Sequence, residues 1–151
     1  MTGLISCTLE CNLACKYCFE GNGEKKCPPN IGEINRRFMD SHDKIIKFID
    51  NLYDYNEQQK TSIIWHGGEP ALVDPKLMDT VMKDQFDKEH NNISWGMQTN
   101  GTIITDKHIE VFKKYNVGVG ISLDGLKEHH DKNRVTQSGK PTFIMMFLQT
   151  I

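Results

Sequence analysis

Short apolar stretches alternate with amphipathic stretches along the chain, and this alternation predicts strands separated by helices. The predicted strands are apolar, partly β-branched and followed by glycine or polar residues; they cover residues 3–9, 61–65, 93–97 and 117–123. Apolar positions at helical spacing predict intervening helices; these cover residues 41–55, start at Pro75, and run from Thr105 to about residue 115.

Local start signals support these helices. Asp74 precedes Pro75, which suits the first position of a helix, and Thr105 is a second capping residue. Residues 21–35 are rich in glycine and proline and are expected to be irregular. After the fourth strand comes a polar segment, and Thr142 opens a last apolar segment with Phe143, Ile144, Met146 and Phe147.

The order is βαβαβαβ, followed by the start of another helix. Such alternation predicts an α/β fold in which helices connect parallel strands. Ligands of such folds bind where the strands end. Each predicted strand ends in a polar or glycine-rich segment, which indicates one shared site; the segments are 11–18, 66–70, 98–101 and 122–125.

Composition narrows the class of protein. The chain has 151 residues, enough for one domain, and 38% hydrophobic with 25% charged residues is ordinary for a globular protein. A net charge of −2 without a basic tract argues against nucleic-acid binding. The sequence shows no apolar run long enough for a membrane span and no basic signal-peptide region at its start, so we expect a cytoplasmic protein.

All five cysteines lie in the first 27 residues, a distribution that suits metal chemistry better than a disulfide framework. Cys11, Cys15 and Cys18 form a Cys-x3-Cys-x2-Cys loop. Three thiolates can hold three irons of a [4Fe–4S] cluster and leave the fourth iron open to a small molecule. There are two alternatives. One is a zinc site completed by Cys7 or Cys27, and the other is that the three cysteines are free and buried.

The other strand ends are ambiguous one by one. The glycine pair at 67–68 lets backbone approach a ligand closely, but it also suits a simple turn. Ser122 could be a strand-end hydroxyl and Arg134 a solvated charge. His66 is a candidate to face the site, and His129 or His130 could pair with Asp131. The remaining histidines are expected at the surface; they are His42, His90 and His108.

Together the segments resemble the radical S-adenosylmethionine (SAM) superfamily, and most of all its anaerobic sulfatase-maturating enzymes and SPASM-type peptide maturases, over residues 3–143. The resemblance implies part of a (β/α)6 barrel, with residues 1–151 forming about four βα units at the N-terminal side of the core domain. It implies that the three loop cysteines bind a [4Fe–4S] cluster. The residues implied to hold SAM are Tyr17, Gly67, Gly68, Glu69, Asn100, Ser122 and Arg134.

Within this family, Tyr17 lies near the adenine, the Gly-Gly-Glu-Pro segment holds the SAM amino group, and Ser122 and Arg134 bind SAM, the arginine at its carboxylate. The implied reaction is reductive cleavage of SAM to a 5′-deoxyadenosyl radical that abstracts hydrogen from a peptide or protein. It needs a one-electron donor such as ferredoxin or flavodoxin. The catalytic base is expected in a C-terminal part outside these residues. The alternatives are a truncated non-catalytic remnant that binds a cluster, and a zinc-binding structural module.

Overall fold

A computed structural model describes residues 1–20 and 29–148 of the chain. Four parallel strands form one sheet in the order β1-β2-β3-β4. Their bounds are β1 Thr2–Thr8, β2 Thr61–Gly67, β3 Ile93–Thr99 and β4 Gly118–Ile121. The predicted α/β class is therefore confirmed. Strand β1 begins and ends one residue earlier than predicted, β2 and β3 each extend two residues further, and β4 is shorter at both ends.

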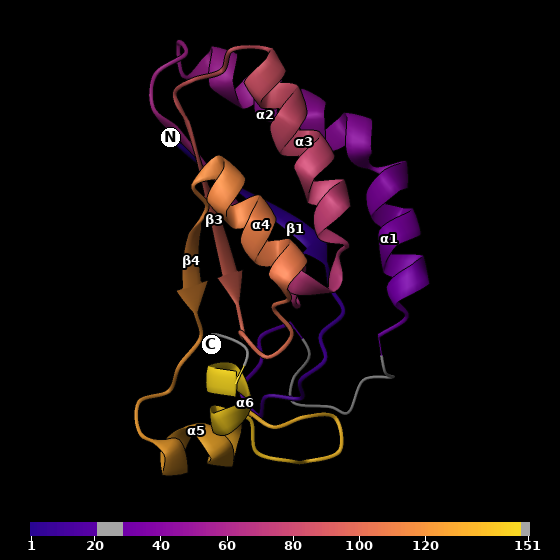
Figure 1. Cartoon of the computed structure of the whole chain (residues 1–151), viewed down its shortest axis with the longest axis vertical. Coiled ribbons are helices and arrows are strands. Elements are labelled where there is room, and N and C mark those ends of the chain that lie inside the picture. The colour runs from indigo at the N-terminus through magenta and orange to yellow at the C-terminus, as the bar shows by residue number, and fades with distance from the viewer. Residues whose placement is uncertain (21–28, 149–151) are drawn as a thin grey trace.

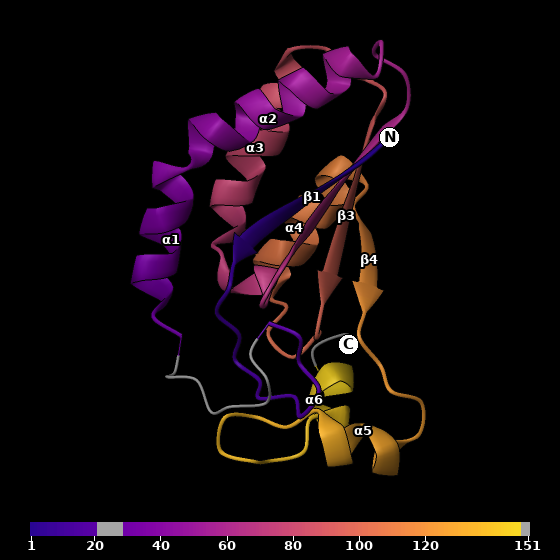
Figure 2. The ribbon, with the colours of Figure 1, turned by 180° about the vertical axis from the view of Figure 1, so that it is seen from behind.

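Helices connect the strands and cover one face of the sheet (Figures 1 and 2). They are α1 Ile31–Asp40, α2 His42–Tyr55, α3 Pro75–Asp87 and α4 Asp106–Tyr115, with a short 3-10 turn, η1, at Pro70–Leu72. On the opposite face the described residues place no helix, and Leu4 of β1 is 62% exposed there. Two further helices, α5 Lys127–Asn133 and α6 Phe143–Leu148, lie beyond the ends to which the strands point.

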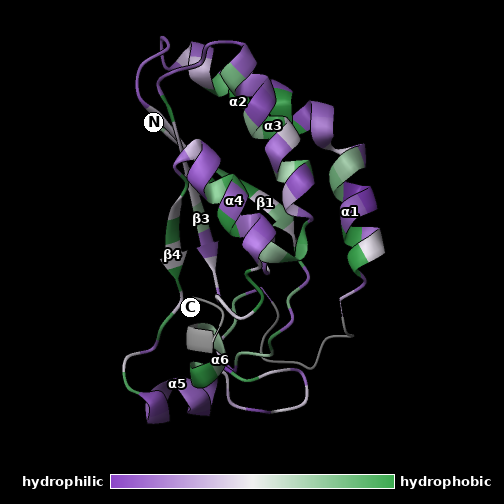
Figure 3. Cartoon of the chain, viewed as in Figure 1, coloured by the Kyte–Doolittle hydropathy of each residue, from purple (hydrophilic) through white to green (hydrophobic). Residues whose placement is uncertain are grey.

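The core lies between the sheet and these helices. Hydrophilic and hydrophobic positions alternate along the helices, as amphipathic helices require (Figure 3). Trp65 of β2 is completely buried and packs against Phe38 of α1 and Trp95 of β3, with ring centroids 6.1 and 5.7 Å apart. The sheet therefore buries one face only, and its other face and the strand ends are left for the site.

One predicted irregular segment is partly wrong. Residues 31–35 of the 21–35 range belong to α1, while 21–28 lie outside the described residues. Asn30 caps the helix, because its Oδ1 accepts the N–H of Glu33 at 3.1 Å. Ile34 and Phe38, one turn apart, bury the inner face of this helix. The glycines and prolines concealed this short amphipathic pattern.

Two histidines depart from the prediction. His108, expected at the surface, is 4% exposed, because its Nδ1 accepts from the N–H of Thr105 at the start of α4 and its ring packs against Phe112. His130 was a candidate partner of Asp131 but lies 3.0 Å from the hydroxyl of Thr142 instead. Burial lowers the pKa of both histidines.

Candidate functional site

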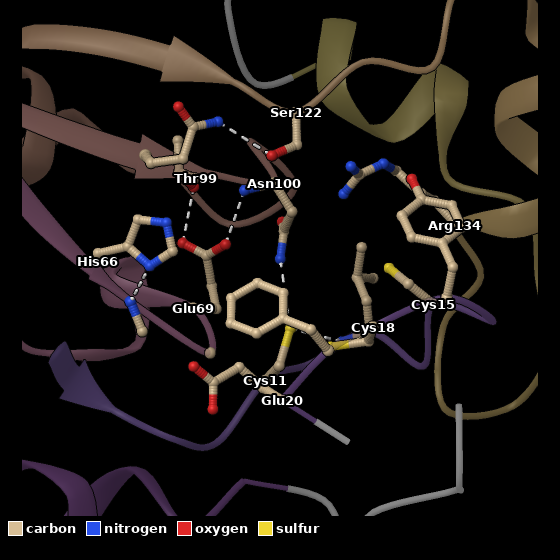
Figure 4. A pocket seen from close by; sticks show the side chains of 16 residues that line it. Cys11, Cys15, Cys18, Glu20, His66, Glu69, Thr99, Asn100, Ser122 and Arg134 are labelled. Carbon is tan, nitrogen blue, oxygen red and sulfur yellow. Dashed lines mark hydrogen bonds between the residues drawn. The ribbon is translucent and has the colours of Figure 1, made fainter. Parts of the chain in front are cut away.

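One pocket opens at the C-terminal edge of the sheet, where the strand-end segments meet (Figure 4). All ten residues predicted to bind the cluster or SAM line it; they are Cys11, Cys15, Tyr17, Cys18, Gly67, Gly68, Glu69, Asn100, Ser122 and Arg134. The structure thus brings the predicted set together, and the ligand that each residue holds stays a prediction. Six lining residues were not in that set: Leu13, Phe19, Glu20, His66, Gln98 and Thr99.

The cysteine loop is paired with a segment from the far end of the chain, residues 133–137, which we call the template segment. Ala14 N–H donates to the carbonyl of Val135 at 2.8 Å and Lys16 N–H to that of Asn133 at 3.0 Å. The pairing is antiparallel. This register sets Cys15 directly opposite Arg134, and directly opposed residues point to the same face. A candidate cluster ligand and a fixed positive charge therefore share one wall of the pocket.

The thiols differ in their surroundings. Cys15 is buried, while Cys11 and Cys18 are half-buried. Burial raises the pKa of Cys11 to about 11, and burial also raises the pKa of Cys15, although the charge of Arg134 opposes that rise. These two thiols are therefore protonated at neutral pH, and a metal that binds them releases their protons.

Arg134 is held in place by Asp124 and Tyr17. Its Nε donates to Asp124 Oδ1 at 2.9 Å, and its guanidinium carbon lies 5.5 Å from the centre of the Tyr17 ring. The Tyr17 hydroxyl donates to the other oxygen of Asp124. Burial alone would raise the pKa of Asp124, but these hydrogen bonds and the arginine charge lower it. The terminal amino groups of Arg134 have no partner among the described residues and remain available to an anion.

Glu69 joins the end of β2 to the end of β3. Its carboxylate is 1% exposed and accepts from Thr99 Oγ1 at 2.6 Å, from the N–H of Asn100 at 2.7 Å and from the N–H of Ala71 at 2.9 Å. Burial raises the pKa of Glu69, while the three donors favour its charged form. Both oxygens are thus engaged by the protein, so the visible role of Glu69 is to fix two strand ends.

The glycine pair allows the turn after β2 to touch the chain just before Cys11. A Cβ at Gly68 would lie 2.2 Å from the carbonyl oxygen of Glu10, and one at Gly67 would lie 2.3 Å from that of Thr8. Gly67 also has a φ of 119°, a left-handed value. Any side chain here would push the two segments apart. The glycines are therefore required by backbone approach within the protein itself.

Asn100 connects β3 to the cysteine loop. Its Nδ2 donates to Asn12 Oδ1 at 2.9 Å and contacts Cys11 Sγ at 3.8 Å. Its Oδ1 accepts from the hydroxyl of Thr102 at 2.6 Å. No pattern marks Asn12 or Thr102, because neither is a defining residue of a motif and they lie far apart in the chain.

A polar row crosses the site on the open face of the sheet. Gln98 Nε2 donates to Ser122 Oγ at 3.0 Å, which links β3 to the end of β4. His66 lines the pocket, as expected, and its Nδ1 accepts the N–H of Gly67 at 2.7 Å. In the neutral ring the proton must then reside on Nε2, which has no protein partner within the described ranges. His66 thus offers one oriented N–H donor.

The cysteines of the described residues can be compared with the two kinds of metal site that the sequence allows. Within residues 1–20 and 29–148, no three side chains of His, Cys, Asp or Glu converge as ligands of one metal ion do. Zinc needs four such ligands around one point, whereas the thiolates of a [4Fe–4S] cluster bind different irons and are spread around it. Cys7 faces the helix-covered side of β1, where burial raises its pKa to about 12, and Cys27 lies outside the described residues.

Most of the chain is similar to known proteins. Residues 5–144 match the Radical SAM superfamily. A serine-type anaerobic sulfatase-maturating enzyme of Bacteroides thetaiotaomicron is 36% identical over 138 residues, which cover 89% of this chain and 31% of that protein. A cysteine-type anaerobic sulfatase-maturating enzyme of Clostridium novyi is 35% identical over 142 residues, covering 88% and 34%.

Solved structures show the same similarity. The structure described as native anSMEcpe with bound AdoMet and Cp18Cys peptide superimposes with a TM-score of 0.73 at 27% identity, covering 99% of this chain and 38% of that one. The fold is therefore that of part of a radical SAM barrel, with a pocket at its strand ends. The chain belongs to the radical SAM superfamily.

Two further findings concern the length of the match and the helices. The chain spans about a third of the length of the sulfatase-maturating relatives above. Within the ranges that the structure describes, none of the helices has the length and apolar character needed to cross a membrane.

Proposed function

We propose that this chain binds a [4Fe–4S] cluster through Cys11, Cys15 and Cys18 and binds SAM beside it, for hydrogen abstraction from a peptide or protein substrate. One observation carries the proposal: the antiparallel register sets Cys15 opposite Arg134 at the rim of a pocket lined by all three cysteines. An anionic ligand held by Arg134 would lie against the cysteine loop. We further propose that residues 1–151 correspond to the N-terminal part of a radical SAM core domain.

When bound, the reduced cluster supplies one electron that cleaves SAM and generates the 5′-deoxyadenosyl radical that removes hydrogen. The chain's own residues bind and orient. Arg134 presents its terminal amino groups to the SAM carboxylate, since Asp124 occupies only its Nε. Ser122 contributes its hydroxyl on the same side, held by Gln98. Tyr17, 53% exposed, presents ring surface on which an adenine can pack.

The opposite wall suits the amino group of SAM. Glu69, Gly67 and Gly68 line this wall, and the negative charge of the Glu69 carboxylate would favour a cationic amino group there. Asn100 completes this side through its contact with Cys11.

The proposed partners are a peptide or protein substrate and a one-electron donor. The similar anSMEcpe structure holds AdoMet and a peptide, which supports a peptide or protein substrate here. A ferredoxin or flavodoxin is proposed as the electron donor, because the cluster must be reduced before each cleavage. The matched part is about a third of these relatives' length, and we propose that the catalytic base comes from outside it.

The test is anaerobic reconstitution of the full chain with iron and sulfide, followed by dithionite and SAM. We expect a brown protein with about four irons per chain and formation of 5′-deoxyadenosine. Alanine at all three loop cysteines should abolish both signals. Cys7→Ala should retain them, because Cys7 faces the helix-covered side of β1 and not the pocket. If the wild-type protein takes up no iron and sulfide on reconstitution, the proposal is refuted. If the purified protein contains zinc without sulfide, the structural-module alternative is correct.

A second candidate is a chain that binds cluster and SAM without turning over a peptide. Its support is that every role argued above for the pocket residues is one of binding or orienting a ligand. The same experiment separates the two: 5′-deoxyadenosine that forms without modification of an added cysteine- or serine-containing sulfatase peptide supports the second candidate. Modified peptide, detected by mass spectrometry, supports the first.

A further inference from the structure

Gln137 ties the end of the template segment to the start of the cysteine loop. Its Nε2 donates to the carbonyl of Leu13 at 2.8 Å and to the carbonyl of Cys11 at 3.2 Å, across 124 and 126 residues of sequence. No sequence motif marks this glutamine. The two contacts satisfy carbonyl groups of the loop that would otherwise lie half-buried without these donors.

The amide has only one workable orientation. Two carbonyl oxygens require donors, and the exchange of Oε1 with Nε2 would set an acceptor against both. A tight turn fixes the backbone on either side of Gln137: Thr136 N–H donates to the carbonyl of Lys140 at 2.9 Å, and Gly139 N–H donates to that of Thr136 at 2.9 Å. Gly139 has a φ of 81°, which suits glycine. Gln137 is thus preorganised rather than flexibly attached.

The three cysteines are held by different means. Cys15 is fixed by the paired amides on either side of it, and Cys18 N–H donates to the carbonyl of Cys15 at 3.1 Å. Cys11 lies outside that pairing. Its backbone carbonyl is held by Gln137, and its sulfur is contacted by Leu13 N–H at 3.4 Å and by Asn100. Gln137 therefore sets the backbone position of Cys11 relative to Cys15.

We infer that Gln137 is a positioning residue for the cluster loop: it clamps the carbonyls of Cys11 and Leu13 so that the three sulfur atoms keep the spacing that the cluster requires. The inference rests on the proposed function where it concerns the cluster. The clamp on the loop itself is a property of the protein alone and is testable without metal.

The test compares Gln137→Met, which keeps the length and removes both donors, with Ser138→Ala, an exposed neighbour in the same turn. After anaerobic reconstitution, iron release to a ferrous chelator should be about tenfold faster in Gln137→Met, because two hydrogen bonds are lost. The electron paramagnetic resonance spectrum of the reduced cluster should shift in that variant. Ser138→Ala should match the wild type in both, and Gln137→Glu, which lacks the donors and sets a carboxylate against both carbonyls, should release iron at least as fast as Gln137→Met.

A second measurement uses the protein without metal. Amide hydrogen exchange at Ala14 and Lys16 should be several-fold faster in Gln137→Met, while the melting temperature stays close to that of the wild type. Unchanged exchange and unchanged iron release would overturn the inference. Wild-type protein that takes up no cluster would refute the proposed function, and exchange would still decide whether Gln137 clamps the loop. A large fall in melting temperature of both glutamine variants would assign Gln137 to global stability and also overturn the inference.

Discussion

Replacing Glu69 by alanine removes the acceptor that joins β2 to β3 at the site. The carboxylate takes two backbone N–H groups, from Ala71 and Asn100, and one hydroxyl, from Thr99. All three donors belong to buried residues. In Glu69→Ala, the two amides have no other acceptor in reach, because their positions are fixed by the strand ends.

The magnitude follows from these contacts. A buried donor left without a partner costs about 1–3 kcal/mol, and the hydroxyl of Thr99 can rotate to lessen its own loss. Removal of a buried charge returns part of this cost. We therefore expect the free energy of unfolding to fall by about 2–5 kcal/mol, a large share of the roughly 5–15 kcal/mol typical of a domain. Glu69→Gln keeps one acceptor oxygen, so its free energy of unfolding should fall by less than that of Glu69→Ala.

The assay is urea unfolding of the metal-free chain at neutral pH, with circular dichroism as the signal. Glu110→Gln is the matched control, since Glu110 is an exposed carboxylate on α4 without a hydrogen bond or ion pair among the described residues; it should change stability by less than about 0.5 kcal/mol. If Glu69→Ala lowers the free energy of unfolding by less than about 1 kcal/mol, the reasoning that this carboxylate fixes two strand ends is wrong.

Three further changes test the packing around the site. Gly68→Ala sets a methyl group 2.2 Å from the carbonyl oxygen of Glu10 and should prevent cluster uptake, measured as iron per chain, whereas Gly32→Ala, with 3.5 Å of clearance in α1, should not. Gly120→Ala brings a methyl group to 2.5 Å from the flexible amide of the neighbouring β3 glutamine and should weaken SAM affinity, measured by anaerobic calorimetry, without unfolding the chain. Burial lowers the pKa of His130, so the unfolded chain takes up its proton first as the pH falls below about 6.5. The contribution of His130 to the free energy of unfolding should be complete above that pH and should decline below it by at most about 1.4 kcal/mol per pH unit. In thermal melts, His130→Gln should remove this part of the decline. An unchanged decline would contradict the assignment.

Much of the site could be predicted because it is encoded locally. The spacing of the cysteines, the glycine pair and the strand-end polar residues are short patterns, and parallel strands bring their C-terminal ends to one edge wherever the fold forms. The helix beginning at Pro75 was likewise predictable from the capping side chain of Asp74. The helix α5 was not, because Lys127–Asn133 is short and polar and has no apolar stripe.

The sequence by itself therefore determined the class of fold, the cysteine triplet and ten of the sixteen residues that line the pocket. Tertiary structure alone decided how those members are held. The pairing of residues 13–16 with the template segment sets Arg134 opposite Cys15, and the clamp of Gln137 on Cys11 spans more than a hundred residues. Such contacts leave no local pattern, because a backbone carbonyl accepts from any donor that the fold carries to it. Burial decided the rest: His108 and Glu69 are polar by type, and only the packed structure shows that both are enclosed and that both oxygens of Glu69 accept from protein donors.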